Sequence, residues 1–149
     1  MAETDVALAA RVQRLEDLDE IRRLYVRYGR LLDDADFAAY AQLFASDAKL
    51  RISKTMRGDT RDEIEAAMTQ ALGGTAGHVV HVIGTPQIEL DGDHATGECL
   101  WMAVVRNADG GPMISGVGRH FDKFVREDGR WRFAERRGHA DIPSALGVR

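Results

Sequence analysis

The segment HVVHVIGTPQIELDGDHATGECLWMAVV, residues 78–105, carries most of the information about the fold. β-Branched residues dominate 78–83, and residues 87–90 alternate between polar and apolar. Asp91-Gly92-Asp93 is typical of a tight turn, and a long strand-like run follows from Ala95 to Val105. This order predicts a β-hairpin and therefore an antiparallel sheet.

The same signals continue to the C-terminal side. Turn residues at 107–111 and 127–129 bound two further strand-like runs, Met113 to Val125 and Trp131 to Arg137. The second half of the chain is therefore expected to form an antiparallel meander.

The first half has helical spacing instead. From about Val12 to Leu32, apolar residues recur every three or four positions, which predicts an amphipathic helix with one buried stripe. The stripe consists of Leu15, Leu18, Ile21, Tyr25, Tyr28 and Leu32. After the aspartate-rich corner 33–36, Asp36 can cap a second helix whose inward residues would be Phe37, Tyr40 and Phe44.

A short strand and a third helix complete this half. Residues 48–52 alternate as a strand, and Thr60 to Glu63 form a capping-box pattern before Ile64, Met68 and Leu72. Gly73-Gly74 ends that helix. The pattern predicts an α+β fold with three N-terminal helices packed on one face of a curved, mainly antiparallel sheet.

Length and composition limit the function. The 149 residues predict a single domain over 1–149, with a core at about 12–140 and termini that are flexible or form an interface. The hydrophobic share of 44%, the charged share of 30% and the net charge of -4 are typical of a globular protein with no nucleic-acid or membrane partner. Cys99 is the sole cysteine, so a cytoplasmic location is expected and an intrachain disulfide is not. The acidic N-terminal segment does not resemble a secretory signal, and no apolar run approaches the ~18 residues of a membrane span.

His78 and His81 are three residues apart, which invites comparison with a metal site. On a strand this spacing places them on opposite faces, so they are not a chelating pair. No HExxH motif or Cys/His cluster is present, and the glycine-containing stretches lack the lysine of a phosphate-binding loop. We therefore expect neither a metal nor another cofactor.

Four segments carry a resemblance to a known family: LYVRYGRLLDD (24–34) with FAAYAQLFASDA (37–48), HVIGTPQIELDGDHATGE (81–98), GVGRHFDKF (116–124) and DGRWRFAERR (128–137). In order and spacing they resemble the SnoaL-like branch of the nuclear transport factor 2-like superfamily, the cone-shaped α+β barrels. The resemblance spans roughly Leu15 to Gly138. Relatives of this kind include scytalone dehydratase and lindane dehydrochlorinase, which are cofactor-independent lyases with a deep apolar cavity.

The resemblance implies specific site residues. The family's catalytic aspartate falls on Asp33, its histidine base on His81 and its arginine on Arg136. Tyr28 stands where the dehydrochlorinase has a lysine, and Thr85 where many relatives have an asparagine. An aspartate on one ring nitrogen makes histidine a better base at the other. From the residues alone, a hydrogen-bonded core histidine is the favoured interpretation of His81, and the family match reverses that preference. Asp33 could be a turn residue, and either Arg136 or Arg137 could point inward.

Several further residues are expected in the cavity. Alternation places Gly118, His120 and Asp122 on one side of a strand, so His120 is either a second pocket histidine or a replacement for an aromatic wall. The residues expected to contact the substrate are Tyr25, Leu50, Ile52, Met68, Cys99, Trp101 and Gly118, although core packing would explain most of them too.

The resulting hypothesis is a cofactor-independent lyase, a dehydratase-type eliminase that acts on a small hydrophobic cyclic compound. His81 is the base, Asp33 orients it, and Tyr28, His120 or Arg136 stabilises charge. The alternatives are an isomerase of the ketosteroid isomerase type and a non-catalytic binding protein on the same fold. A homodimer or homotrimer is expected.

Overall fold

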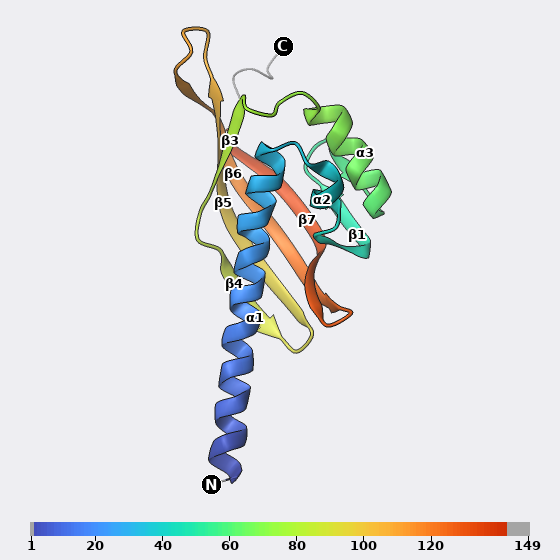
Figure 1. Ribbon diagram of the computed structural model, residues 1–149, viewed down its shortest axis with the longest axis vertical. Helices are drawn as coiled ribbons and strands as arrows, with labels where there is room; N and C mark the ends of the chain where they lie inside the picture. The colour runs from blue at the N-terminus through green and yellow to red at the C-terminus, as the bar shows by residue number, and fades with distance from the viewer. Residues whose placement is uncertain (1, 143–149) are drawn as a thin grey trace.

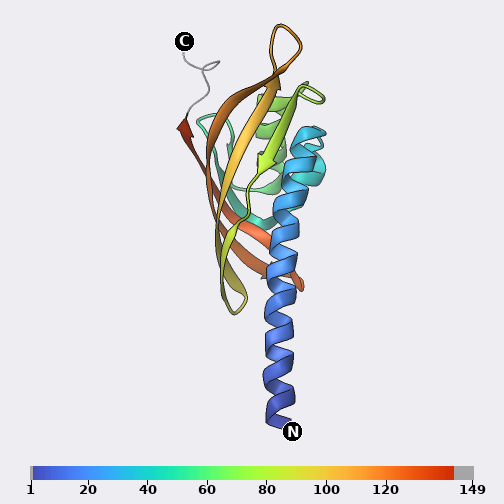
Figure 2. The same cartoon turned by 90° about the vertical axis from the view of Figure 1, so that its left-hand side faces the viewer.

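The computed structural model describes residues 2–142 (Figure 1). The elements follow in the order α1 (Ala2–Asp33), α2 (Phe37–Ala41), β1 (Phe44–Arg51), β2 (Arg57–Gly58), α3 (Arg61–Leu72), β3 (Val79–Ile83), β4 (Gln87–Asp91), β5 (His94–Arg106), β6 (Pro112–Glu127) and β7 (Arg130–Ile142). The predicted α+β architecture is confirmed: the helices lie on one face of a curved sheet (Figures 1 and 2). The expectation for the last residues of the chain lies outside the described part.

The sheet is mixed, mostly antiparallel and open. Its strands lie in the order β2-β1-β7-β6-β5-β3, and β4 pairs with β5 beyond the end of β3. β1 and β7 are parallel, whereas the remaining pairs are antiparallel. Strong curvature lets the inner face enclose a core against α1, α2 and α3, so a cavity can form between the helices and the sheet.

Helix α1 packs through the second half of its length. Ile21, Tyr25, Tyr28 and Leu32 are buried as predicted. The predicted start near residue 12 is wrong, because the helix begins at Ala2. Leu15 was expected in the buried stripe and is 65% exposed, since this part of α1 extends beyond the sheet and has nothing to pack against (Figure 2).

The aspartate-rich corner separates α1 from α2. Asp36 caps α2 by accepting a hydrogen bond from the Ala39 N–H at 3.0 Å. Phe44 was predicted on this helix but begins strand β1, where it lies opposite Phe133 of β7. Pairing with the last strand thus overrides the helical spacing of Phe37, Tyr40 and Phe44, although all three side chains are buried.

The third helix has the predicted ends. Thr60 caps it by accepting a hydrogen bond from the Glu63 N–H at 3.2 Å, and Gly73 is its C-cap residue. The short strand β2 was not predicted, because two residues are too few for a periodic pattern. Within residues 2–142, no helix combines the length and the apolar character that crossing a membrane requires.

Candidate active site

Asp33 and His81 are in direct contact. Asp33 is the last residue of α1 and His81 is the central residue of β3. The Asp33 Oδ1 atom accepts two hydrogen bonds, from the backbone N–H of His81 at 2.9 Å and from Nδ1 at 2.8 Å. Because a carboxylate can only accept, the proton lies on Nδ1, and Nε2 carries the lone pair of a potential base.

A glycine allows this contact. A Cβ atom on Gly29 would lie 3.0 Å from Ile83 Cγ1, so α1 approaches β3 more closely than a helix with a side chain at this position could. Asp33 lies one helical turn after Gly29 on α1, and His81 lies two residues before Ile83 on β3. The close approach of Gly29 to Ile83 therefore brings Asp33 beside His81. Gly29 has no distinctive signal in the sequence, because a glycine within a helical pattern usually only weakens the helix.

An apolar cavity of about 130 Å³ opens next to this pair. It lies between the inner face of the sheet and the helices. Its walls are formed by Tyr28, Leu32, Tyr40, Ile52, Met56, Met68, Leu72, His81, Trp101 and His120. Most of this surface is hydrocarbon, so the few polar side chains on it would fix the orientation of any ligand.

Tyr28 and His120 form a second polar pair in the cavity wall. The Tyr28 hydroxyl and His120 Nε2 are 2.8 Å apart, and His120 is only 4% exposed. Burial, reinforced by the charge of Arg136, holds the pKa of His120 well below its ordinary value. Burial raises the pKa of Tyr28, so the neutral imidazole faces a protonated hydroxyl.

The proton between these two groups can take two positions. With Nδ1 protonated, the tyrosine donates to Nε2; with Nε2 protonated, the histidine donates and the hydroxyl hydrogen of Tyr28 is free. His120 Nδ1 is buried without a hydrogen-bond partner among the described residues. The first arrangement leaves the Nδ1 donor unpaired, and the second leaves both the Tyr28 hydroxyl hydrogen and the Nδ1 acceptor unpaired.

Arg136 lies behind the cavity wall, not on it. Its guanidinium makes two hydrogen bonds to Asp122, at 2.7 and 2.9 Å, and both side chains are fully buried. Burial opposes the charge on Arg136, but Asp122 outweighs burial and the pKa of Arg136 is raised. The charge lies 4.0 Å from the centre of the Tyr28 ring, so Arg136 acts on the cavity through that tyrosine.

This arrangement decides between the two adjacent arginines. Arg136 points inward, whereas the Arg137 side chain is 68% exposed and pairs with Glu135. Asp122, which also accepts a hydrogen bond from the Tyr25 hydroxyl at 2.7 Å, was not among the expected site residues. Alternation with His120 had placed it on the inner face, which is the signal that could have identified it.

The expected substrate contacts separate into two groups of three residues and Gly118. Ile52, Met68 and Trp101 line the cavity. Tyr25, Leu50 and Cys99 are buried in the core and do not line it, and burial raises the pKa of the Cys99 thiol to about 11. Gly118 does not line the cavity but leaves room for the Trp101 ring, because a Cβ atom at this position would lie 2.7 Å from Trp101 Cζ2.

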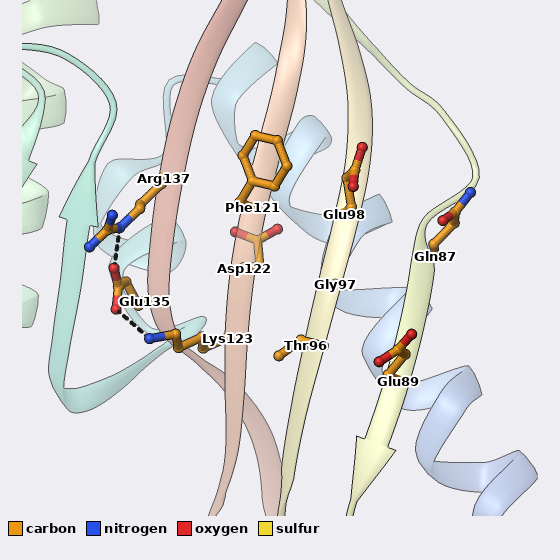
Figure 3. A pocket seen from close by; sticks show the side chains of 10 residues that line it. All are labelled: Gln87, Glu89, Thr96, Gly97, Glu98, Phe121, Asp122, Lys123, Glu135 and Arg137. Carbon is orange, nitrogen blue, oxygen red and sulfur yellow. Dashed lines mark hydrogen bonds and ion pairs between the residues drawn. The ribbon is translucent and has the colours of Figure 1, made fainter.

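A larger hollow of about 470 Å³ lies on the outer face of the sheet, away from α1 (Figure 3). Lys123 and Arg137 both pair there with Glu135, and Glu89 and Glu98 add further acidic groups to its wall. None of the five histidines lines this hollow. His81 and His120 line the cavity on the inner face instead.

The fold and the site together define a class: α+β proteins in which an open, curved sheet and its helices enclose a small apolar cavity with a few acid-base side chains. Residues 13–137 match the model of the SnoaL-like domain family, and the chain belongs to that family. The family includes polyketide cyclases and dehydratases.

Three solved structures illustrate the similarity. A nuclear transport factor 2-like protein with a cystatin-like fold from Novosphingobium aromaticivorans is 29% identical, with a TM-score of 0.82, over 93% of this chain and 91% of that chain. A candidate scytalone dehydratase from the same organism is 22% identical, with a TM-score of 0.78, over 91% of each chain. ActVI-ORFA from Streptomyces coelicolor is 24% identical, with a TM-score of 0.71, over 83% of this chain and 96% of that chain. The latter two similarities concern the fold alone. Comparison with curated proteins yields no significant match.

Proposed function

We propose that the protein is a cofactor-independent lyase that eliminates water from a small hydrophobic ring compound. The observation that carries this proposal is the Asp33–His81 hydrogen bond at 2.8 Å on the wall of an apolar cavity. A histidine held in this way can remove a proton from a carbon atom next to an electron-withdrawing group.

The proposed reaction needs only side chains of this chain. His81 Nε2 removes a proton from carbon, the carbon-carbon double bond forms, and the hydroxyl group on the neighbouring carbon leaves. The same proton then passes from the imidazolium to the departing hydroxide, so water is released and His81 returns to its neutral form. Asp33 stabilises the imidazolium while it exists.

Tyr28 is the proposed partner for negative charge that develops on the substrate. Its hydroxyl is free to donate when His120 presents Nε2–H to it, and the nearby charge of Arg136 strengthens it as a donor. Arg136 makes this contribution through Tyr28, so it is a positioning residue. Trp101 stacks on His120 with 28° between the ring planes and would form a flat wall for the substrate.

The size of the cavity supports a small substrate. A volume of about 130 Å³ is close to the ~150 Å³ of an engineered apolar cavity that accommodates benzene. A single six-membered ring matches this space.

An isomerase is the second candidate, and one feature of the cavity favours it. Tyr28 and His120 are hydrogen-bonded to each other, whereas His81 Nε2 faces the cavity as the base for a proton on carbon. An isomerisation needs no separate acid for a leaving group, because the base that removes the proton returns it at another carbon.

The test is a screen of monocyclic hydroxy-ketones, followed by ultraviolet absorbance of the conjugated product. Asp33→Asn and His81→Gln should each lower turnover by at least ~100-fold. His78→Gln, at an exposed histidine just before β3, is the matched control and should retain full activity. A fully active His81→Gln variant would exclude the mechanism, and ring compounds that bind without any turnover would favour a non-catalytic carrier.

A further inference from the structure

A hollow of about 490 Å³ lies beside α1, where the helix meets the turn that joins β6 to β7. One wall is formed by α1 residues at positions 20, 23, 24 and 27, a spacing that places them on one face of the helix. The other walls come from the connection between α2 and β1 and from residues 129–132. Among the described residues, none lines both this hollow and the apolar cavity, so the two are separate.

The wall of this hollow is strongly basic. It contains four arginines, Arg23 and Arg27 from α1 and Arg130 and Arg132 from the start of β7. Of the described residues that line it, Glu20 alone is acidic, and its carboxylate already accepts a hydrogen bond from the backbone N–H of residue 131 at 2.8 Å. Four arginines and one glutamate give the wall a formal charge of +3, in a chain whose net charge is -4.

Two of the four arginines have acidic partners. Asp19 pairs with Arg23 at 2.8 Å, and Glu127 lies 3.4 Å from Nε of Arg132. The Arg132 guanidinium also donates a hydrogen bond to the Gln42 carbonyl oxygen, and its side chain is only 22% exposed. Arg132 is therefore held in the wall by contacts on two sides.

The other two arginines lack such partners. Arg27 and Arg130 are exposed, and neither forms an ion pair with any residue of 2–142. Like charges around one hollow repel each other, and a concave wall of one sign concentrates counter-ions. An anion bound between Arg27 and Arg130 would remove this repulsion.

The chemistry and the size of the hollow point to the kind of anion. Guanidinium groups match the oxygens of a phosphate group with paired hydrogen bonds, which a compact ammonium group cannot do. The volume of about 490 Å³ exceeds the need of a single ion and lies within the range of roughly 300–1,000 Å³ typical of small-molecule sites. Leu24 and Leu43 also line the hollow, so it offers carbon surface beside the charges.

We propose that this hollow binds a small organic molecule that carries a phosphate or diphosphate group. Arg27, Arg130 and Arg132 hold the phosphate oxygens, and the carbon skeleton lies toward Leu24 and Leu43. The site goes beyond the activity proposed for the apolar cavity and does not depend on it.

Calorimetric titration of the full-length protein at neutral pH and constant ionic strength tests the site. Inorganic phosphate and pyrophosphate should each bind saturably with one site per chain, and pyrophosphate should bind more tightly because it reaches more guanidinium groups. Ribose 5-phosphate, an organic phosphate too polar for the apolar cavity, should bind at least as tightly as inorganic phosphate. Weaker binding of ribose 5-phosphate would show that the hollow does not admit a carbon skeleton and would overturn that part of the proposal.

Substitution of single arginines locates the binding. Arg27→Gln and Arg130→Gln should each weaken pyrophosphate binding by at least about tenfold, because each removes hydrogen bonds to a charged group. Arg22→Gln is the matched control, since Arg22 is an exposed arginine of the same helix that does not line the hollow. It removes the same charge and should leave binding unchanged. Thermal unfolding without anion should show that Arg27→Gln is at least as stable as the wild type.

Three results would overturn the proposal. The first is the absence of saturable binding of both anions. The second is equal weakening by Arg27→Gln and Arg22→Gln, which would indicate general electrostatic attraction without a site. The third is tighter binding of an oligoglutamate peptide than of pyrophosphate, which would assign the hollow to an acidic protein partner. None of these measurements depends on turnover, so their failure is distinct from failure of the reaction proposed for His81.

Discussion

Gly29 of α1 and Ile83 of β3 touch at the point where the helix comes nearest to the strand. A Cβ atom on the glycine would lie 3.0 Å from Ile83 Cγ1, which is closer than two carbon atoms normally approach. This contact sets the distance between α1 and β3, and thereby the distance between Asp33 and His81.

Gly29→Val should therefore affect the candidate site more than the fold. We expect a destabilisation of about 1–3 kcal/mol from overpacking and a loss of turnover of about 100-fold from displacement of Asp33. Urea unfolding and steady-state kinetics measure the two effects. Adding Ile83→Ala should relieve the crowding and restore part of the activity; no recovery in the double variant would contradict this explanation.

The neutral state of His120 predicts a pH-dependent stability. Its pKa in the folded protein is held well below 6.5, whereas the unfolded chain binds a proton near that pH. The free energy of unfolding should therefore be fully retained above about pH 6.5 and should fall as the pH drops below it, by up to ~1.4 kcal/mol per pH unit until the folded pKa is reached. Urea unfolding between pH 5 and pH 8 measures this slope.

His120→Phe should remove that contribution to the slope, whatever its effect on the absolute stability. His78→Gln should leave the slope unchanged, because His78 is exposed in both states. Identical slopes for the wild type and His120→Phe would show that His120 is not held neutral.

The buried pair of Asp122 and Arg136 predicts a large penalty for losing one partner. Asp122→Asn preserves the shape but leaves the guanidinium without a counter-charge, at a cost of about 3–5 kcal/mol. Glu98→Gln removes the acid of a half-exposed pair with Arg119 and should cost under about 1 kcal/mol. Chemical denaturation compares the two variants. Equal effects would mean that the buried pair is compensated by groups other than Asp122.

Two glycines of β6 make a matched pair for a steric test. A Cβ on Gly118 would lie 2.0 Å from the His139 carbonyl oxygen, whereas one on Gly116 would be no closer than 3.6 Å to any neighbour. Gly118→Ala should therefore destabilise the protein by about 3 kcal/mol or more, and Gly116→Ala by less than about 1 kcal/mol. Thermal unfolding distinguishes them, and a tolerated Gly118→Ala would be inconsistent with this strand spacing.

The elements were predictable where local chemistry and packing agree. Thr60 and Gly73 bound α3 with side-chain and backbone caps, which are visible in the sequence. The start of α1 was missed because the first helical residues contact nothing that would impose an inward stripe. Phe44 was misplaced because its partner, Phe133, is distant in the chain.

The contact of Asp33 with His81 could be expected only from the family resemblance, since 48 residues separate them. Alternation identified which residues face inward but not how deep they lie. Leu50 and Cys99 share the inner face with Trp101, yet only Trp101 reaches the cavity. Depth depends on the curvature of the sheet and on close approaches such as that of Gly29, and neither follows from periodicity.

The parallel pairing of β1 with β7 has a consequence for how the molecule is made. Among the strands of residues 2–142, β1 is the first to leave the ribosome and β7 is the last, and the short β2 covers the other edge of β1. Ile52, just after β1, packs against Gly138 of β7, and β7 also supplies Arg136 beneath Tyr28. Contacts so distant in sequence form late and slow the search for the native state. The apolar cavity is therefore completed only after β7 has been synthesised, well after the helices and the other strands that form its walls.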